Sequence, residues 1–315
     1  MLSLTPRFGA VGGMAFVALC ASGSPAGAVE TGLSIYLKGA TAFMSGILPP
    51  DPGAYVTSTY YFYDGTADSE VRDGKIELGV EAKLNAGLLG STFVTDWHFL
   101  GGQYAMGVTI DYLGLNLDAT VQSQLGNREV ELGNDGIGDS IVTPIILGWH
   151  DGNLHWNTSL SVFVPTGSYS KNELNVGRNV WGFFPQFSMT YFDPKNGLDI
   201  SGTLTYVTMT ENNATDYQSG DIVHLDWAVG EHFGAKGAWE AGIAGNLVEQ
   251  ISPDSGSGAV LGPFKAQSFG LGPAVSYQTV LGHVPVNFGV RWEHDLMHHN
   301  TFDGDVVSVS ATAVL

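Results

Sequence analysis

Hydrophobic and polar residues alternate with a period of two along most of the chain. From Ile76 to Leu88 every even position is apolar, whereas the odd positions between Lys75 and Gly87 are charged, polar or glycine. The same alternation recurs over 198–206, 223–229 and 284–293. Because successive side chains of a β-strand point to opposite faces, each segment is predicted to be a strand with one apolar and one polar face.

The pattern predicts about twelve strands. Their expected ranges are Ala54–Tyr63, Lys75–Leu89, Gln103–Leu115, Ile141–Trp149, Leu154–Pro165, Trp181–Tyr191, Leu198–Thr208, Asp221–His232, Trp239–Gln250, Ala266–Tyr277, Val284–His294 and Val306–Leu315. Near Leu113 the apolar positions change from even to odd, which we interpret as a bulge or an early strand end.

The connections between these strands fall into two length classes. Short turns rich in Gly, Asn or Asp are expected at 151–153, 193–197, 234–237 and 281–283. Longer polar links are expected at 116–140, 166–180, 209–220, 251–265 and 295–305. From the third strand onward, long and short connections alternate, as in transmembrane β-barrels with short periplasmic turns and long outer loops.

Aromatic residues support the same fold class. Trp149 and Trp156 flank one short turn, while Trp181 and Trp292 lie beside long links, as expected for two interfacial girdles. The alternative, a secreted soluble β-sandwich, gives no reason for sorting its loops by length. We therefore predict an all-β fold, a transmembrane antiparallel β-barrel of about 12 strands with an N-terminal segment that could plug the lumen.

The first residues are typical of an export signal. Arg7 precedes an apolar stretch from Phe8 to Cys20, and Ala26–Ala28 has the small-x-small form of a cleavage site. Lipoprotein cleavage before Cys20 is disfavoured because bulky Leu19 precedes it. The expected organisation is a signal peptide at 1–28, an N-terminal segment at 29–53 and an outer-membrane barrel at 54–315. The N-terminal segment lacks strand alternation, so a plug and a flexible leader both remain open.

Composition narrows the function classes. Charged residues make up 14% of the chain, 43 residues are glycine and the formal net charge is −19, so a nucleic-acid partner is not expected. The one cysteine lies in the predicted signal peptide, which leaves the mature chain without disulfide, thiolate or cysteine–metal chemistry.

If the apolar strand faces contact lipid, the polar faces line the interior. The predicted lumen-lining residues, which would form a solute path, are Glu77, Glu81, Lys83, His155, Asn157, His224, Asp226, Arg291 and Glu293, with Asp199, His232 and Glu240 on the same polar faces. Such residues either form a hydrogen-bonded scaffold that supports the barrel or a polar ring that sets which solutes pass.

No motif specifies catalysis, a cofactor or a metal. The chain lacks a Gly-x-Ser-x-Gly elbow and a His-Glu-x-x-His pair, and the i, i+2 spacing of His224 and Asp226 arises easily on a polar strand face. His294, Asp295, His298 and His299 are metal-capable, but a solvated loop explains them more simply. The turn-like stretch 134–139 lacks the closing Glu of a calcium loop. We therefore predict no catalytic residues, no cofactor and no metal.

Several clusters resemble the MetA-pathway of phenol degradation family of outer-membrane proteins. The matching pieces are Pro52–Tyr55, Gly138–Ser140 with Thr143–Pro144, Leu147–Trp149, Phe163–Tyr169, Asn175–Gly177, Asn179, Trp181, Pro185, Thr215–Tyr217, Ser219–Gly220, His224 and Asp226. The resemblance implies a transporter for small hydrophobic or aromatic compounds in the Gram-negative outer membrane. Its expected partners are outer-membrane lipid, the solute and the barrel-assembly machinery. A barrel hydrolase and a structural or adhesive barrel are the alternatives.

Overall fold

The computed structural model describes residues 34–71, 76–123, 126–171, 173–259 and 265–315, without the side chains of 68–71, 76–78, 121–123 and 126–128. The described chain is almost entirely β-structure. Its strands are β1 (Gly53–Val71), β2 (Ile76–Phe99), β3 (Gly102–Ser123), β4 (Gly126–Ile137), β5 (Ser140–Asp151), β6 (Leu154–Val164), β7 (Gly182–Asp193), β8 (Leu198–Met209), β9 (Ile222–Phe233), β10 (Trp239–Gln250), β11 (Gln267–Leu281), β12 (Val284–His299) and β13 (Asp303–Val314), with a 3₁₀ turn η1 at Ala235–Gly237.

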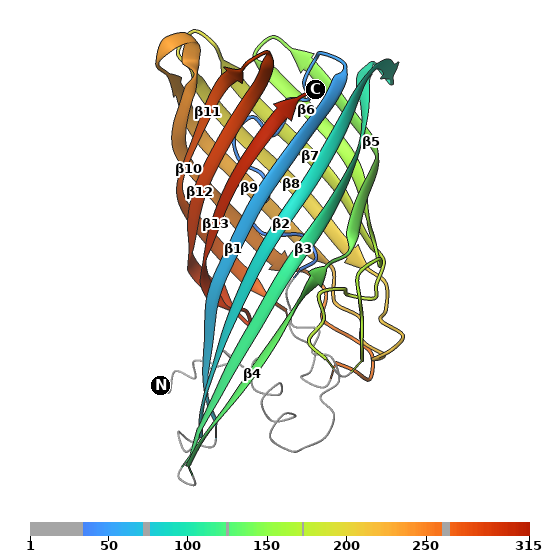
Figure 1. Ribbon diagram of the computed structural model, residues 1–315, viewed down its shortest axis with the longest axis vertical. Helices are drawn as coiled ribbons and strands as arrows, with labels where there is room; N and C mark the ends of the chain where they lie inside the picture. Colours follow the sequence, from blue (N-terminus) through green and yellow to red (C-terminus); the bar gives the residue numbers. More distant parts are fainter. Residues whose placement is uncertain (1–33, 72–75, 124–125, 172, 260–264) are drawn as a thin grey trace, which may run out of the picture.

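The strands close into an antiparallel barrel (Figure 1). Apart from β4, each strand pairs with its neighbours in chain order, with β3 pairing directly with β5. Closure comes from β1 pairing with β13, in a register that places Tyr55 opposite Val314. Of the thirteen strands, all except β4 form the ring, because β4 pairs along the outer part of β3. The predicted twelve-stranded antiparallel barrel is therefore confirmed. Closure leaves no sheet edge to carry unpaired backbone groups in a membrane.

The prediction of a long loop at 116–140 is wrong. β3 continues to Ser123, and β4 returns beside it, pairing over 112–123. β5 then pairs with the remaining part of β3, over 103–109, so that β4 and β5 act as one strand broken at Gly138–Asp139. Asp139 is buried at the break, where its carboxylate accepts hydrogen bonds from the backbone N–H groups of Gly167 and Arg178 at 2.7 and 2.6 Å.

The change of apolar positions from even to odd near Leu113 is due neither to a bulge nor to an early strand end. The β2–β3 pairing runs without a register shift on both sides of this residue. Ile110 and Tyr112 are exposed on the outer face, whereas Leu117 and Ala119, on the opposite parity, are buried inside. The strand therefore continues past the lipid belt. Beyond it the outer face contacts water and the inner face becomes the apolar one.

Within the belt, the burial pattern is inverted relative to a soluble protein. On β8, Ile200 and Leu204 are 47% and 50% exposed on the outside, while Thr203 and Thr205 between and beside them are buried. A continuous apolar outer surface around a polar interior is the arrangement that a lipid environment selects.

The two ends of the barrel differ. The short-turn end, at the top of Figure 1, carries the connections 100–101, 152–153, 194–197, 234–238 and 282–283, and the C-terminus of β13 lies there. The long-loop end carries the links 165–181, 210–221 and 251–266. The link expected at 295–305 is shorter than predicted, because β12 extends to His299 and β13 begins at Asp303. We assign the short-turn end to the periplasmic side.

No helix among the described residues is long and apolar enough to cross a lipid bilayer.

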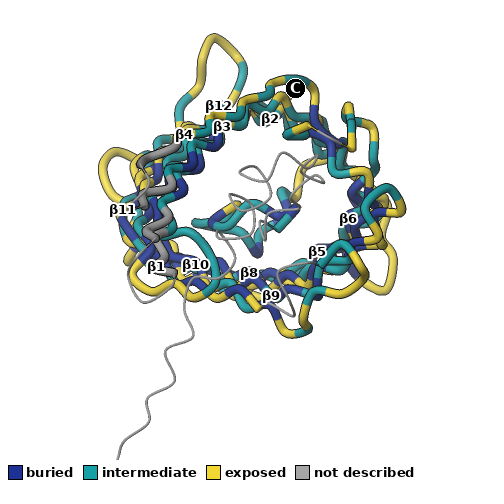
Figure 2. The backbone as a smooth tube through the Cα atoms, turned by 90° about the horizontal axis from the view of Figure 1, so that it is seen from below, coloured by how far each residue is buried: buried dark blue, intermediate teal, exposed yellow. Residues whose placement is uncertain are grey.

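Residues 34–52, here called the lumen segment, run inside the ring of strands (Figure 2). The segment has no regular secondary structure, and it joins β1 at Gly53 on the short-turn end. Seen along the barrel axis, its backbone occupies part of the interior.

Candidate functional site

The carboxylate of Asp226 on β9 is the main attachment point for the lumen segment. Its Oδ2 accepts a hydrogen bond from the Tyr36 hydroxyl at 2.8 Å, and its Oδ1 accepts one from the backbone N–H of Gly39 at 3.0 Å. The backbone N–H and the hydroxyl of Thr41 each donate to Oδ2 at 3.3 Å. Asp226 is fully buried, so four donors from an irregular segment satisfy a charge that water does not reach.

Charged residues of β12 hold the same part of the segment. Arg291 donates from a guanidinium N–H to the carbonyl oxygen of Thr41 at 2.8 Å and forms an ion pair with Glu293, with Nε and Oε1 3.2 Å apart. Lys38 of the segment forms an ion pair with Asp295. At Gly39 the backbone is left-handed (φ +66°), which favours glycine, and a Cβ atom would lie 2.8 Å from Glu293 Oε2.

The second half of the lumen segment is attached nearer the short-turn end. The backbone N–H of Met44 donates to Asp199 Oδ2 on β8 at 2.8 Å, and that of Gly46 donates to the Thr190 hydroxyl on β7 at 2.9 Å. Asn157 on β6 donates to the carbonyl oxygen of Ser45 at 2.8 Å. The backbone groups of the segment, which lack strand partners, are thus satisfied by side chains of the barrel wall.

A cavity of about 270 Å³ lies between the lumen segment and the opposite wall. Its lining is mainly apolar and aromatic. It comprises Ile35, Tyr36 and Leu37 of the segment, Tyr61 and Tyr63 of β1, Leu84 and Leu88 of β2, Leu113 and Leu115 of β3, Ile141, Phe163, Ile222 and Val248. An apolar cavity inside an otherwise polar barrel interior is the feature most suited to hold a small hydrophobic solute.

Polar and charged residues also line this cavity, namely Ser34, Lys38, Thr109, Asp111, Asp139, Arg178, His224, Gln267, Ser268 and Thr301. His224 is buried, and its Nε2 lies 2.9 Å from the Ser34 hydroxyl, while its Nδ1 has no hydrogen-bond partner among the described residues. Asp111 and Asp139 line the cavity as well, and Asp111 Oδ1 is a further buried atom without a hydrogen bond in the described part of the chain. These atoms would give a solute polar contacts at defined points of an apolar lining.

The structure places most of the predicted lumen residues on the inner face. Asn157, His224, Asp226, Arg291 and Glu293 contact the lumen segment or one another there. His155 lies on the same face of β6 as Asn157, near the short-turn end, with its Nδ1 2.7 Å from that of His150. Whether any of these residues touches a passing solute stays a prediction.

The assignment of Glu81 and Lys83 to the lumen is wrong. These two residues form an ion pair with each other, with side chains 40% and 38% exposed, while the alternate residue Ala82 is buried inside. This part of β2 extends beyond the lipid belt, so water contacts its outer face and the polar residues point outward. The side chain of Glu77 lies outside the described residues.

Sequence reasoning missed the aromatic and apolar lining. Tyr61 and Tyr63 are buried, and Tyr36 packs edge-on against His224 with ring centroids 4.9 Å apart. Two sequence features could have identified this lining. The inner face of β1 carries large aromatic rings in place of polar residues, and Ser34, Tyr36 and Lys38 alternate in the lumen segment.

A similar solved structure, an outer membrane channel, supports this fold. A crystal structure of an outer membrane channel from Pseudomonas putida F1 matches with a TM-score of 0.61 and 13% sequence identity, covering 85% of this chain and 100% of that chain. The β domain of the Bordetella autotransporter BrkA matches with a TM-score of 0.47 and 11% identity, over 84% of this chain and 100% of that one. No curated protein matches the sequence.

The family model described as "Putative MetA-pathway of phenol degradation" matches residues 58–311, which is most of the chain. A closed antiparallel β-barrel with an apolar, lipid-facing outer surface is the architecture of outer-membrane proteins. The chain belongs to the MetA-pathway of phenol degradation family.

Proposed function

We propose that the protein is a passive channel for small hydrophobic solutes, including aromatic ones, and that the lumen segment narrows its path. The apolar cavity between the segment and β1–β3 carries this proposal. Barrel interiors that serve water-soluble solutes are polar. This interior is polar where the segment is bound and mainly apolar in the cavity, where polar side chains also occur.

The size of the cavity supports a small solute. A cavity of about 270 Å³ is slightly smaller than the usual range for ligand pockets, roughly 300–1,000 Å³. An apolar cavity of about 150 Å³ is enough for benzene. A single-ring aromatic compound therefore fits, and the aromatic side chains of Tyr36, Tyr63 and Phe163 offer edge-to-face contacts to it.

Two further observations favour transport of such solutes. The family is named for phenol degradation, and the Pseudomonas putida structure is described as an outer membrane channel. A porous or apolar-lined lumen is not needed by an adhesive or purely structural barrel. The solute would enter at the long-loop end, pass along the β1–β3 side of the segment and leave toward the periplasm.

The contact between Ser34 and His224 suggests one alternative function, that of a hydrolase. The Ser34 hydroxyl and His224 Nε2 are 2.9 Å apart, as a nucleophile and its base would be. In such a pair a third group orients the imidazole through its Nδ1, but His224 Nδ1 has no hydrogen-bond partner among the described residues. We therefore favour a channel that performs no chemistry on its solute.

Uptake into liposomes tests the proposal. The mature barrel is refolded into liposomes with lipopolysaccharide in the outer leaflet, which retards apolar solutes, and is compared with the same liposomes without protein for the uptake of radiolabelled toluene and of a hydrophilic disaccharide. We expect the protein to accelerate toluene equilibration relative to the disaccharide. Equal acceleration of both would indicate a general pore, and a correctly folded barrel that accelerates neither would overturn the transport function.

A further inference from the structure

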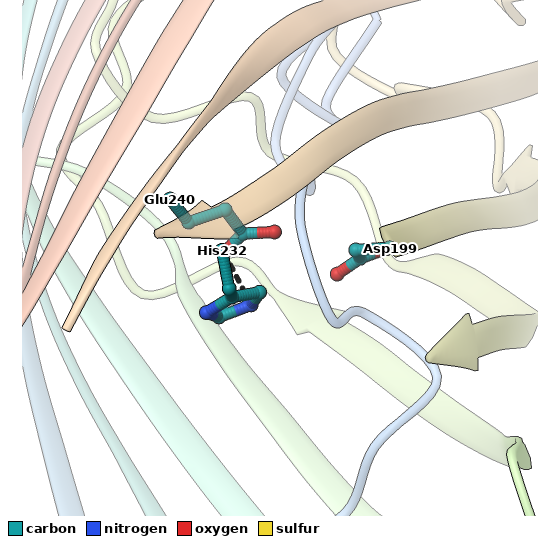
Figure 3. A group of neighbouring side chains, drawn as sticks. All are labelled: Asp199, His232 and Glu240. Atoms are coloured by element: carbon teal, nitrogen blue, oxygen red, sulfur yellow. Dashed lines mark ion pairs between the residues drawn. The ribbon is translucent and has the colours of Figure 1, made fainter. Parts of the chain in front are cut away.

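Three metal-capable side chains meet on the inner wall near the short-turn end, away from the cavity (Figure 3). They are Asp199 at the start of β8, His232 at the end of β9 and Glu240 at the start of β10. We propose that they form a binding site for a divalent transition-metal cation of the Zn²⁺ type. This proposal does not depend on the transported solute.

The sheet register brings the three residues together. His232 and Glu240 are directly paired across β9 and β10, and Asp199 is paired with Gly230, two residues before His232 on the same face. All three side chains therefore point to the lumen from adjacent strands. The positions are fixed by backbone pairing, which is the rigid support that a metal site requires.

The distances are close to those of a coordination sphere. One ligand atom from each residue lies within 4.8 Å of the other two, and His232 Nε2 is 3.3 Å from Glu240 Oε2. Zn²⁺ bonds to imidazole nitrogen and carboxylate oxygen measure about 2.0–2.2 Å, which places tetrahedral ligand atoms roughly 3.4 Å apart. The imidazole and the Glu240 carboxylate already have this spacing, so a small rotation of Asp199 would complete three ligands.

Surrounding groups orient the ligands for a cation. His232 Nδ1 is 3.1 Å from the carbonyl oxygen of Gly237, so an Nδ1–H donates to it and the other ring nitrogen, Nε2, faces Glu240. The Ser201 hydroxyl donates to Asp199 Oδ1 at 2.6 Å, and the Ser276 hydroxyl lies 3.2 Å from Glu240 Oε2. Imidazole backed by a carbonyl and carboxylates backed by hydroxyls are the outer contacts of metal sites.

A second observation, independent of the clustering, points to a missing cationic partner. Glu240 is 1% exposed, and its Oε1 has no hydrogen-bond partner among the described residues; the same holds for His232 Nε2. Within the described ion pairs, neither Asp199 nor Glu240 contacts a lysine or arginine. Besides His232, the two buried carboxylates have only each other as a charged neighbour in the described part of the chain, so they must either share a proton or be neutralised by a cation, and a divalent ion would neutralise both.

The site is also connected to the lumen segment. Asp199 Oδ2 accepts the hydrogen bond from the backbone N–H of Met44, a residue in the left-handed region with φ 55°. A cation bound to Asp199 would hold this acceptor in place. Metal loading is therefore expected to slow the exchange of the Met44 amide and to strengthen the attachment of the segment to the wall.

Metal titration of the folded protein tests the proposal. The mature barrel in detergent is treated with a chelator, dialysed and titrated with Zn²⁺ by calorimetry and with Co²⁺, whose visible absorption reports coordination. We expect one ion per chain. The variants His232→Gln and Glu240→Gln should lose this binding while keeping the circular dichroism of the barrel.

The exposed pair His150 and His155 provides the matched control, because it is the other close imidazole contact at the same end. The double variant H150Q/H155Q should retain the ion. Ser276→Ala, which removes only a hydroxyl behind Glu240, should weaken Zn²⁺ binding by about 10-fold even if the ligand variants fail to fold. Loss of the ion in H150Q/H155Q, its retention in H232Q, or no stoichiometric binding to the folded wild type would each overturn the proposal.

Discussion

The hydroxyl of Tyr36 donates a hydrogen bond to Asp226 Oδ2 at 2.8 Å, across 190 residues of sequence. This contact joins the lumen segment to the barrel wall and lies beside the cavity that Tyr36 also lines. The same residue therefore serves both to anchor the segment and to shape the space left for a solute.

Replacing Asp226 by Asn should loosen the lumen segment. The amide keeps the size of the carboxylate but offers one acceptor oxygen, and its NH₂ would meet backbone N–H donors of Gly39 or Thr41. Loss of a charge-assisted hydrogen bond costs about 1.5–3 kcal/mol, which is roughly a 10- to 100-fold increase in detachment. Hydrogen–deuterium exchange of the amides of Gly39 and Thr41 measures it.

Asp51→Asn is the control for this variant, because Asp51 lies on the same segment but is exposed. It should leave the exchange of both amides unchanged. Unaltered exchange in a correctly folded D226N barrel would show that Asp226 does not hold the segment.

Gly39→Ala should displace the segment by a steric route. The added Cβ would lie 2.8 Å from Glu293 Oε2, and the backbone at φ +66° disfavours alanine by about 1 kcal/mol. We expect increased cleavage of the segment by a protease added to the detergent-solubilised barrel. Gly87→Ala, where a Cβ meets nothing within 4 Å, should behave as wild type. Equal protease resistance of the two variants would argue against close packing at Gly39.

The orientation of the barrel can be checked with two lysines. Lys83 lies on the outer face of β2 near the long-loop end, and Lys195 is exposed in a short turn. We expect Lys83→Cys to react with a membrane-impermeant maleimide on intact cells, and Lys195→Cys to react only after the outer membrane is permeabilised. The opposite pattern would invert the assignment of the two ends.

The alternation with a period of two predicted most of the strands, because a strand in the lipid belt has an apolar outer face that can be recognised in the sequence. It failed at β4, where Glu129 and Glu131 are exposed and Val130 and Leu132 point inward. Outside the belt the outer face contacts water, so the strand resembles a polar link. The same physics explains why Glu81 and Lys83 were placed on the wrong face.

Only part of the candidate site could be predicted from the sequence. Polar strand faces placed Asp226, Arg291 and Glu293 inside the barrel, where the structure has them. Their partners belong to an irregular segment whose contacts, such as Gly39 N–H to Asp226, are long-range and follow no sequence period. The apolar cavity was missed for the same reason, since it exists only where the segment leaves the β1–β3 wall uncovered.

The most direct test of the account compares two neighbouring tryptophan substitutions. Leu88 lines the cavity, while Leu89 is 48% exposed on the outer face of the same strand. Leu88→Trp should fill the cavity and reduce toluene uptake into liposomes at least several-fold, whereas Leu89→Trp should leave it at the wild-type rate. Equal toluene uptake by the two folded variants would contradict passage through the lumen cavity.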